Sequence, residues 1–354
     1  MTVIATSATS EFSQREERTD NNSDFLDNAQ IEMLRRLDRD LRSAAKLMGQ
    51  AEARFLVDAY YSLQKVRIGS GQQLKAASLR PTAVLSWVHD SMKILEHDIQ
   101  LTLGVFAKEY RVGRWLLSVK GIGPTIAAGL LAELDVRGRP TAGHFIRFAG
   151  LDPSVEWNSG QKRPWNASLK TLVVFKAGES FVKVQNRDGA LYGKLFAERK
   201  AKELDRNRHG LNAEYCQREV VRRDAVAKRG KDKNWAKRRR WYAGEISPDV
   251  WDELMHLSGV AERERCVKKH HVGPGKGVPM LPPNHVHDRA RRWVAKIFLS
   301  HLHHVMYEDY YGTEPPVPYI FAHSNGEHVH YIPVPGWPVT GGKSLHELYD
   351  EKAD

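Results

Sequence analysis

The chain has 354 residues and a formal net charge of +11, and 41% of its residues are hydrophobic while 27% are charged. That length exceeds the usual size of one domain, and the composition is ordinary for a globular protein with a substantial core. No stretch approaches the roughly 18–20 apolar residues that span a bilayer, and the first residues lack the pattern of a secretory signal. The two cysteines, Cys216 and Cys266, are too few for a disulfide framework. We therefore expect a soluble protein of a reducing, intracellular compartment, without a membrane partner.

The first third of the chain is predicted to be helical. Residues 1–24 are rich in Ser, Thr, Asn and charge, which is typical of a disordered leader. Apolar residues then recur at three- and four-residue spacing, from Ile31 to Val66 and again from Val84 to Phe106. We expect Gly69-Ser70-Gly71 to end the first helix and Pro81 to open the second. The resulting coiled-coil-like hairpin must bury its apolar stripe, and both self-pairing into a homo-oligomer and packing onto the next module stay open.

The next segment is predicted to form two short helices joined by a tight turn. Trp115 to Val119 end one apolar helix and Pro124 to Leu134 open another, with Gly121-Ile122-Gly123 between them. Glycines let a turn approach a phosphate closely, and the start of a helix presents unpaired N–H groups at the positive end of its dipole. Ile122 is expected to plug the turn into the helix pair. The expected DNA-contacting residues of this module are Arg114, Lys120, Gly121, Ile122, Gly123 and Thr125.

Such a module is a helix-hairpin-helix that holds the DNA backbone without reading the bases. The alternative interpretation is a corner between helices that needs glycine for packing alone.

The same segment resembles the C-terminal domain of one transposase family. The likeness is carried by Leu117 to Thr125, Ala127-Ala128, Leu130 to Leu134, Phe148 to Pro153 and Asn158-Ser159-Gly160. These motifs are similar to those of the "IS one-ten" insertion-sequence transposases, bridge-RNA-guided recombinases that combine a RuvC-like DEDD domain with a serine-bearing domain. The resemblance implies DNA as a partner, a guide RNA as a further partner, and a nucleophilic serine at Ser159. It also implies a closing helix over 284–312, in which Arg291 and Arg292 join the DNA-contacting set.

The first domain of that family has no counterpart among the predicted elements. Family members begin with β-strands that carry four metal-binding carboxylates, whereas the first 110 residues here are predicted to be helical. The resemblance matches the helical hairpin to the coiled-coil linker of the family instead.

Ser159 is the candidate catalytic residue. Serine recombination needs a hydroxyl near a scissile phosphate and cations that stabilise the developing charge. Lys162, Arg163, Lys170 and Lys176 follow closely enough in the sequence to line a phosphate. Three interpretations stay open: an intact nucleophile in a site that uses Mg²⁺, a relic serine in a DNA-binding domain, and an ordinary turn residue.

Residues 190–283 are predicted to be a basic insertion. Between Ala190 and Ala243, 17 Lys or Arg stand against 7 Asp or Glu, and such a localised positive field attracts a polyanion through counterion release. The densest run, Lys237-Arg238-Arg239-Arg240, lies between Trp235 and Trp241-Tyr242. We expect this run to contact DNA or RNA, with the rings stacking on exposed bases. The alternatives are that the tryptophans belong to a core, and that the basic segment is a solvated face with no ligand.

Sixteen histidines raise the question of a metal. The candidate groups are Cys266 with His270 and His271, His285 with His287, and His301 with His304. The gap from Cys216 to Cys266 does not match a paired zinc knuckle. No metal site is therefore predicted.

The predicted fold is mainly α, with a small β-hairpin near the C-terminus. The hairpin is indicated by Ser324-Asn325-Gly326 between Tyr319–Phe321 and His328–Ile332. The expected domains are a leader (1–24), the long helical hairpin (25–112), the helix-hairpin-helix domain (113–189), the basic insertion (190–283), the closing helix (284–312) and the β-hairpin with a C-terminal tail (313–354).

The favoured function is transposase-like, nucleoid-associated DNA binding in the cytoplasm, by a homo-oligomer that cuts and rejoins strands through serine phosphoryl transfer. One alternative is a non-catalytic accessory or regulatory DNA-binding protein derived from such a transposase. The other is an RNA-binding protein that uses the basic insertion.

Overall fold

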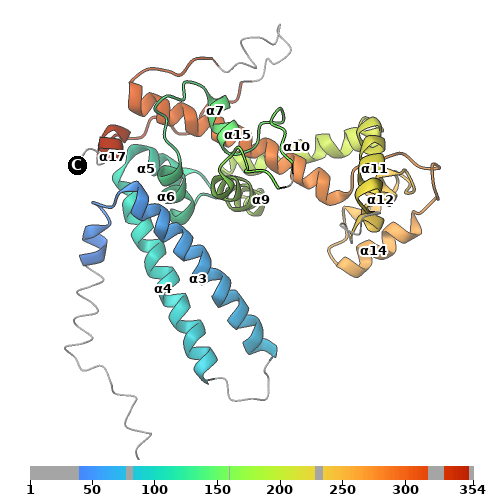
Figure 1. Ribbon diagram of the computed structural model, residues 1–354, viewed down its shortest axis with the longest axis horizontal. Helices are drawn as coiled ribbons and strands as arrows, with labels where there is room; N and C mark the ends of the chain where they lie inside the picture. The colour runs from blue at the N-terminus through green and yellow to red at the C-terminus, as the bar shows by residue number, and fades with distance from the viewer. Residues whose placement is uncertain (1–39, 77–82, 159, 228–233, 318–330, 351–354) are drawn as a thin grey trace, which may run out of the picture. The chain divides into compact units, whose positions relative to one another are not determined.

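The computed structural model describes residues 40–76, 83–158, 160–227, 234–317 and 331–350 (Figure 1). Within these ranges the protein is mainly helical, as predicted, and no strand is formed. Contacts divide the chain into two compact units, Met1–Met48 with Tyr60–Phe106 and Gly49–Ala59 with Ala107–Asp354. None of the described helices combines the length and the apolar character that crossing a lipid bilayer requires.

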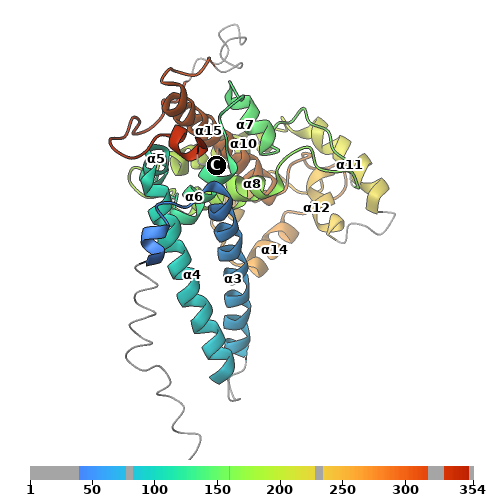
Figure 2. The ribbon, with the colours of Figure 1, turned by 60° about the vertical axis from the view of Figure 1, so that its left-hand side comes forward.

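The first unit is dominated by two antiparallel helices. α3 (Gln50–Ala76) and α4 (Ala83–Glu109) lie side by side in both views (Figures 1 and 2). The Arg67 guanidinium donates to the Glu96 carboxylate, with Nε 2.6 Å from Oε2. This hydrogen bond lowers the pKa of Glu96 because it favours the charged carboxylate. The helical pair predicted from the apolar spacing is confirmed.

The prediction that Gly69-Ser70-Gly71 ends the first helix is wrong, because α3 continues to Ala76. Ser70 and Gly71 instead let α4 come close, at His89. A Cβ on Gly71 would lie 3.1 Å from the His89 ring, and Ser70 Oγ lies 3.0 Å from His89 Nδ1. The first helix is interrupted earlier than expected, since residues 45–49 form a turn before α3 begins.

The second unit contains the remaining described helices. They are α5 (Arg111–Ser118), α6 (Pro124–Glu133), α7 (Ala142–Phe148), α8 (Ala167–Lys170), the π-helix η2 (Thr171–Ala177), α9 (Gly178–Lys183), α10 (Leu191–Arg208), α11 (Ala213–Ala227), α12 (Trp235–Tyr242), α13 (Val250–Leu254), α14 (Val260–Lys269), α15 (Pro283–Tyr311) and α17 (Leu345–Asp350).

The core of this unit forms around α15, the helix predicted to close the domain. α15 packs on α5, α7, α9, α10 and η2. Its Phe298 ring is fully buried, with its centroid 5.2 Å from that of Phe181 and 5.3 Å from that of Tyr192. Tyr192 also donates to His301 across a 2.8 Å contact. Because rings of this size each contribute roughly 1.5–3 kcal/mol when buried, this cluster is a main source of stability.

The segment predicted as a basic insertion begins within that core and then forms a second one. Tyr192 and Phe196, at the start of α10, are buried in the main core. Further along, Trp241 packs with Trp251, and Trp235 packs with Tyr242. These four rings are no more than 5% exposed. The interpretation that the tryptophans belong to a core therefore holds, and they are not free to stack on bases.

The C-terminal segment returns to the main core. Trp115 Nε1 donates to the Pro335 carbonyl at 2.7 Å, and the Arg111 guanidinium forms a 2.7 Å ion pair with the buried carboxylate of Asp309. The predicted β-hairpin falls mostly on residues 318–330, which lie outside the described ranges, and Ile332 just beyond them is not in a strand. Cys216 and Cys266 are both buried free thiols.

Candidate nucleic-acid interface

The segment between α5 and α6 forms the tight turn that the sequence predicts. α5 ends at Ser118 and α6 begins at Pro124. Inside the turn, the Ile122 N–H donates to the Val119 carbonyl at 2.9 Å. Ile122 is only 6% exposed, so its side chain plugs the turn into the helix pair as expected.

The two glycines of this turn have different roles. Gly121 has φ +102°, and a Cβ there would lie 3.1 Å from the Phe181 ring and 3.3 Å from Val184. Glycine is thus required at this position by backbone angle and by packing against α9. Gly123 has an extended backbone, and a Cβ there would meet nothing within 4 Å. The space in front of Gly123 is open.

The turn also leaves backbone amides open. Gly123 is the N-cap of α6 and offers no side chain to cap the helix. Among the described residues, no acceptor bonds to the N–H groups of Gly121, Gly123, Thr125 or Ile126. Gly121, Gly123 and Ile126 are partly exposed, whereas Thr125 is 4% exposed. Unpaired amides at the positive end of a helix are the arrangement that holds an anion.

The two cations expected beside the turn have different surroundings. Lys120 is exposed, and no carboxylate in the described ranges pairs with it. Arg114 is also exposed, but its guanidinium donates through Nε to the Lys108 carbonyl at 2.6 Å and packs closely against Gly341 and Gly342. That carbonyl carries no net charge, so Arg114 keeps its positive charge while its position is fixed.

The loop that precedes α8 folds back onto the end of α7. Gly150 has φ +63°, and a Cβ there would lie 2.6 Å from the Trp165 ring. The Asn166 amide group then donates to Glu133 of α6 at 2.7 Å, while Asn166 Oδ1 caps α8 by accepting from the Leu169 N–H. These contacts fix both ends of the loop. Ser159 lies outside the described residues.

Cations and rings alternate along this loop. The Arg163 guanidinium lies 5.5 Å from the Trp157 ring centroid, and Lys170 Nζ lies 4.6 Å from that of Trp165. The pKa of Lys170 is lowered by burial and by the charges of Arg292 and Arg163. The charges of these three cations therefore act on one another, as they do where positive charge is concentrated.

The other predicted DNA-contacting residues near this loop differ in exposure. Lys162 is exposed. Lys176 is partly buried, and burial together with the charge of Lys183 lowers its pKa. Arg291 pairs with Glu179 at 3.0 Å and with Asp288 at 2.7 Å, and its side chain is 12% exposed. It holds α15 to α9, so we leave it out of the interface.

The four cations of the basic run Lys237–Arg240 differ in whether their side chains are already paired. Arg239 pairs with Asp224 and with Glu245, each at 3.2 Å. Lys237 forms an exposed 2.9 Å pair with Glu264. Arg238 has its own partner. The side chain of Arg240 forms no hydrogen bond or ion pair with the described part of the chain.

Sequence reasoning missed the cations that α14 places opposite α12. Arg263 and Lys268 line a cavity together with Arg240 and Arg292. Nothing in the sequence pairs these residues, because α12, α14 and α15 are separated by long stretches of chain. Sequence reasoning also missed the rings of Trp157 and Trp165, which contact Arg163 and Lys170. Their closeness to these two cations in the sequence was the signal that could have indicated them.

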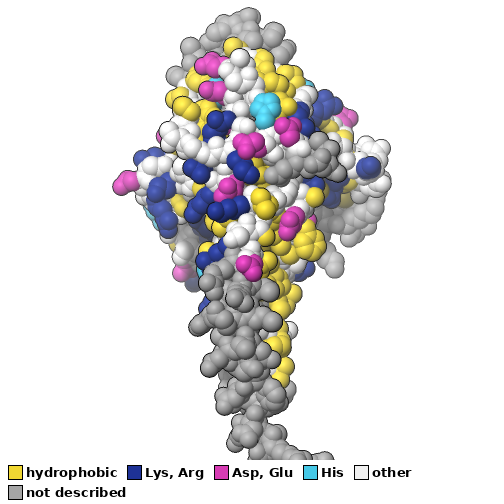
Figure 3. Space-filling model, turned by 90° about the vertical axis from the view of Figure 1, so that its left-hand side faces the viewer, with side chains coloured by type: hydrophobic (Ala, Val, Ile, Leu, Met, Phe, Trp, Pro, Cys, Tyr) yellow, Lys and Arg dark blue, Asp and Glu magenta, His cyan; other side chains and the backbone are white. Residues whose placement is uncertain are grey.

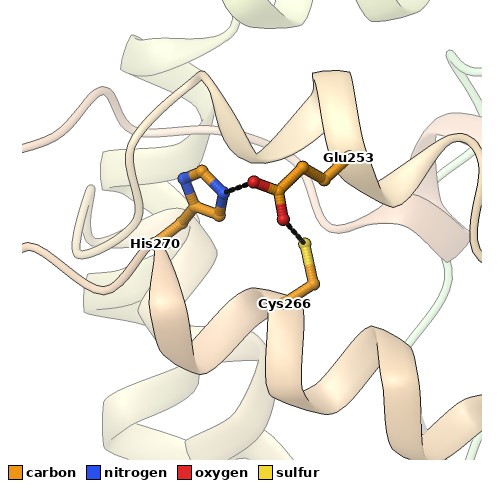
Figure 4. A group of neighbouring side chains, drawn as sticks. All are labelled: Glu253, Cys266 and His270. Carbon is orange, nitrogen blue, oxygen red and sulfur yellow. Dashed lines mark hydrogen bonds and ion pairs between the residues drawn. The ribbon is translucent and has the colours of Figure 1, made fainter.

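One group of side chains has the composition of a metal site. Glu253 from α13 and Cys266 and His270 from the end of α14 face one another (Figure 4), and their ligand atoms lie within 4.8 Å of each other. Cys266 Sγ is 3.9 Å from Glu253 Oε2, and His270 Nε2 is 3.2 Å from Oε1. Lys269 also pairs with Glu253. The carboxylate therefore already has two partners, and side-chain hydrogen bonds from Lys269 and His270 lower its pKa.

On the face shown in Figure 3, Lys and Arg side chains are interspersed with Asp and Glu. Net charge alone therefore does not locate a binding site on this face.

Comparison with known proteins identifies one segment. Residues 113–175 match the transposase IS116/IS110/IS902 family, so this part of the chain is consistent with a transposase domain of that type. The match covers α5, the turn, α6, α7, the Trp157–Lys170 loop and most of η2. No curated protein and no solved structure matches the chain.

Proposed function

We propose that this protein is a transposase-like DNA-binding protein that holds the duplex backbone at the turn between α5 and α6. The observation that carries the proposal is the set of open, partly exposed amides of Gly121, Gly123 and Ile126 beside the exposed Lys120. A phosphate in front of Gly123 would accept from these amides and pair with the Lys120 ammonium. The match of residues 113–175 to a transposase family makes DNA the expected polyanion.

Substitution of Gly123 tests this proposal sharply. The backbone of Gly123 is extended, as N-cap residues usually are, and its Cβ position is open. In Gly123→Asp, the new carboxylate would cap α6 by accepting from the amides that we assign to phosphate. We expect thermal stability to be kept or raised, while duplex DNA affinity falls at least about tenfold because the amides are occupied and the added charge repels phosphate.

Gly123→Asn is the matched control, since it caps the helix with the same shape and no charge. It should weaken binding less than Gly123→Asp, and Lys120→Gln should lower the salt slope of duplex binding by about 1. Fluorescence anisotropy at several salt concentrations measures all three variants. Unchanged duplex affinity in a folded Gly123→Asp protein would remove the turn from the interface.

We propose further that Ser159 is the nucleophile of strand cutting and rejoining. In that step Oγ forms a bond to the scissile phosphorus, the bond from phosphorus to the leaving strand's oxygen breaks, and the serine proton passes to that oxygen. The support is the family match, which includes position 159, and the cations Arg163, Lys170 and Arg292 that gather beside the loop. These cations would stabilise the negative charge that develops on the phosphate.

The non-catalytic alternative rests on the N-terminal region. Residues 40–44 and α3 and α4 are helical, so strand-borne carboxylates of the kind that hold Mg²⁺ in the family are not formed by the described residues before α5. Incubation with branched and duplex DNA and Mg²⁺ separates the two proposals. A covalent protein–DNA adduct that is lost in Ser159→Ala supports the nucleophile, whereas binding without any adduct supports an accessory protein.

We also propose that the protein self-associates through the helical pair. Large apolar side chains on α3 and α4 are exposed, including Val84 at 77% and Trp87 at 69%. A surface of this kind is normally covered in a soluble protein. Analytical ultracentrifugation tests this by comparing the molecular mass of Trp87→Glu with that of the unaltered chain. If both proteins sediment as monomers, self-pairing is excluded.

RNA binding through the basic insertion is the remaining candidate. It would be favoured over duplex binding if, at matched salt, RNA bound more tightly than duplex DNA of the same sequence.

A further inference from the structure

A positively charged cavity lies between α12, α14 and the N-terminal part of α15. The cavity has a volume of about 870 Å³, within the usual range of ligand pockets. Seven Lys or Arg side chains line it against two carboxylates, those of Glu264 and Asp288. Both carboxylates are occupied, because Glu264 pairs with Lys237 and Asp288 pairs with Arg291.

Three of the lining cations are not paired with a carboxylate of the described residues. Within the described ranges, the side chains of Arg240, Lys268 and Arg292 form no hydrogen bond or ion pair. Arg240 and Lys268 lie near enough to Glu264 to help lower its pKa, although Lys237 is the larger cause. An empty, positively charged cavity of this kind gains most from an anionic ligand that brings its own charge.

The wall of the cavity also offers apolar and polar surface. Val260 is 78% exposed at the rim, and Val267, Trp241 and Tyr242 contribute further apolar lining. The Tyr242 hydroxyl lies 2.8 Å from His285 Nδ1, and burial together with the charges of Arg292 and Arg289 lowers the pKa of His285 to about 4. His285 is therefore neutral at physiological pH and leaves the positive charge to the Lys and Arg side chains.

Arg292 acts on both the cavity and the loop before α8. It lines the cavity, and its charge also lowers the pKa of Lys170. A nucleic-acid strand carries both kinds of group that the lining of the cavity can contact. Phosphates alternate with flat bases along such a strand, which matches a cavity that mixes cations with apolar surface.

We propose that this cavity binds unpaired nucleotides of a nucleic-acid strand, with the phosphate on Arg240, Lys268 and Arg292 and the base against the Val260–Val267 side. The volume of about 870 Å³ is sufficient for individual nucleotides. Bases of a duplex are already paired and stacked, so the apolar wall favours unpaired bases. The inference rests on the proposed function only in that the partner is a nucleic acid. It assigns a second site, distinct from the turn, to the single-stranded part of that partner.

The test uses the full chain and short labelled oligonucleotides of one sequence as single-stranded DNA, single-stranded RNA and duplex DNA. The variant is Arg240→Gln with Lys268→Gln. Its matched control is Lys194→Gln with Lys202→Gln, which removes two exposed cations of α10 that do not line the cavity. Thermal melting confirms that both proteins fold.

We expect the cavity variant to lose roughly tenfold or more in single-strand affinity and to lower the single-strand salt slope by about 1.4, while duplex affinity changes less than about twofold. The control should keep its single-strand affinity within about twofold. Equal losses in the two variants, or no loss in the cavity variant, would overturn the proposal.

Two further arms identify the ligand. If adenosine monophosphate competes with the single strand far better than inorganic phosphate does, the cavity recognises a nucleotide. Equal competition by inorganic phosphate would reduce the site to an anion site and contradict the proposal. Gly123→Asp in the same assay separates the two sites, since it should weaken duplex binding and spare single-strand binding.

Discussion

The turn between α5 and α6 and the basic run of α12 offer charge to a ligand in different ways. At the turn, open amides of the backbone face the space in front of Gly123, and one exposed lysine stands beside them. In α12, Lys237 and Arg239 already pair with carboxylates, and Arg240 is left to the ligand. Local backbone geometry can therefore form an anion site with few charged side chains. In a dense run of cations, only those that are not paired with carboxylates from distant parts of the chain are available to a ligand.

The largest effect is expected on the free energy of unfolding at acidic pH. It can be compared between His301 in the core of the second unit and His285 in the wall of the cavity. Burial lowers the pKa of His301 from 6.5 to about 4. Between those values the unfolded chain takes up a proton that the folded chain refuses, so stability is complete above about pH 6.5 and falls as the pH drops toward 4. The loss for this residue is up to roughly 3 kcal/mol.

Thermal or denaturant unfolding across this range measures the effect. His301→Gln should flatten the dependence, whereas an unchanged slope in that variant would mean that His301 does not titrate with folding. His285→Gln is the companion in the insertion, because the pKa of His285 is lowered to about 4 as well.

The next effect distinguishes the two glycines of the turn. Gly121→Ala places a side chain at φ +102° against Phe181, so we expect a loss of about 2 kcal/mol in the free energy of unfolding. Gly123→Ala should stay within about 1 kcal/mol of the unaltered protein, since its backbone angles suit alanine and its Cβ meets nothing. Chemical denaturation measures both. Equal losses would show that the turn is built only for packing.

A smaller effect divides the α12 run. Arg239→Ala removes the partner of Asp224 and of the largely buried Glu245, and should lower stability by about 1 kcal/mol. Arg240→Ala should leave stability unchanged within about 0.5 kcal/mol and reduce single-strand binding instead. The reverse pattern, in which Arg239→Ala reduces binding in a protein of unaltered stability, would contradict the assignment of Arg239 to structure.

The smallest effect is expected at Lys237. Its pair with Glu264 is exposed on both sides, so Lys237→Ala should not measurably change the melting temperature. It should raise the pKa of Glu264, since the hydrogen bond from Lys237 is the main cause of its lowering. Titration of that carboxylate by NMR measures the change, and an unaltered pKa would show that the pair does not form in solution.

The local elements of the fold could be predicted because their signals are local. Apolar spacing indicates α3, α4 and α6, and Pro124 after Gly123 marks a helix start within a few residues of sequence. The same reasoning failed at Gly69-Ser70-Gly71, where the helix continues because a neighbouring helix needs the space beside Gly71. A contact across two helices decides that position, and the sequence of one helix does not contain it.

The candidate sites also differ in whether their signals are local in the sequence. Lys120 and the glycines of the turn are recognisable from neighbouring residues. The partners that occupy Arg239 and Arg291, and the cavity that brings Arg240, Lys268 and Arg292 together, depend on helices distant in sequence. Composition could therefore indicate a polyanion but not the cations that are available to it.

Hydrogen exchange at the turn tests the central claim most directly. We expect the amides of Gly121, Gly123 and Ile126 to exchange quickly in the free protein and to be protected when duplex DNA is added, while Gly123→Asp slows exchange at Ile126 without DNA because its carboxylate caps the helix. If DNA bound with full affinity and left these amides unprotected, the turn would not be the place where the protein holds the DNA backbone.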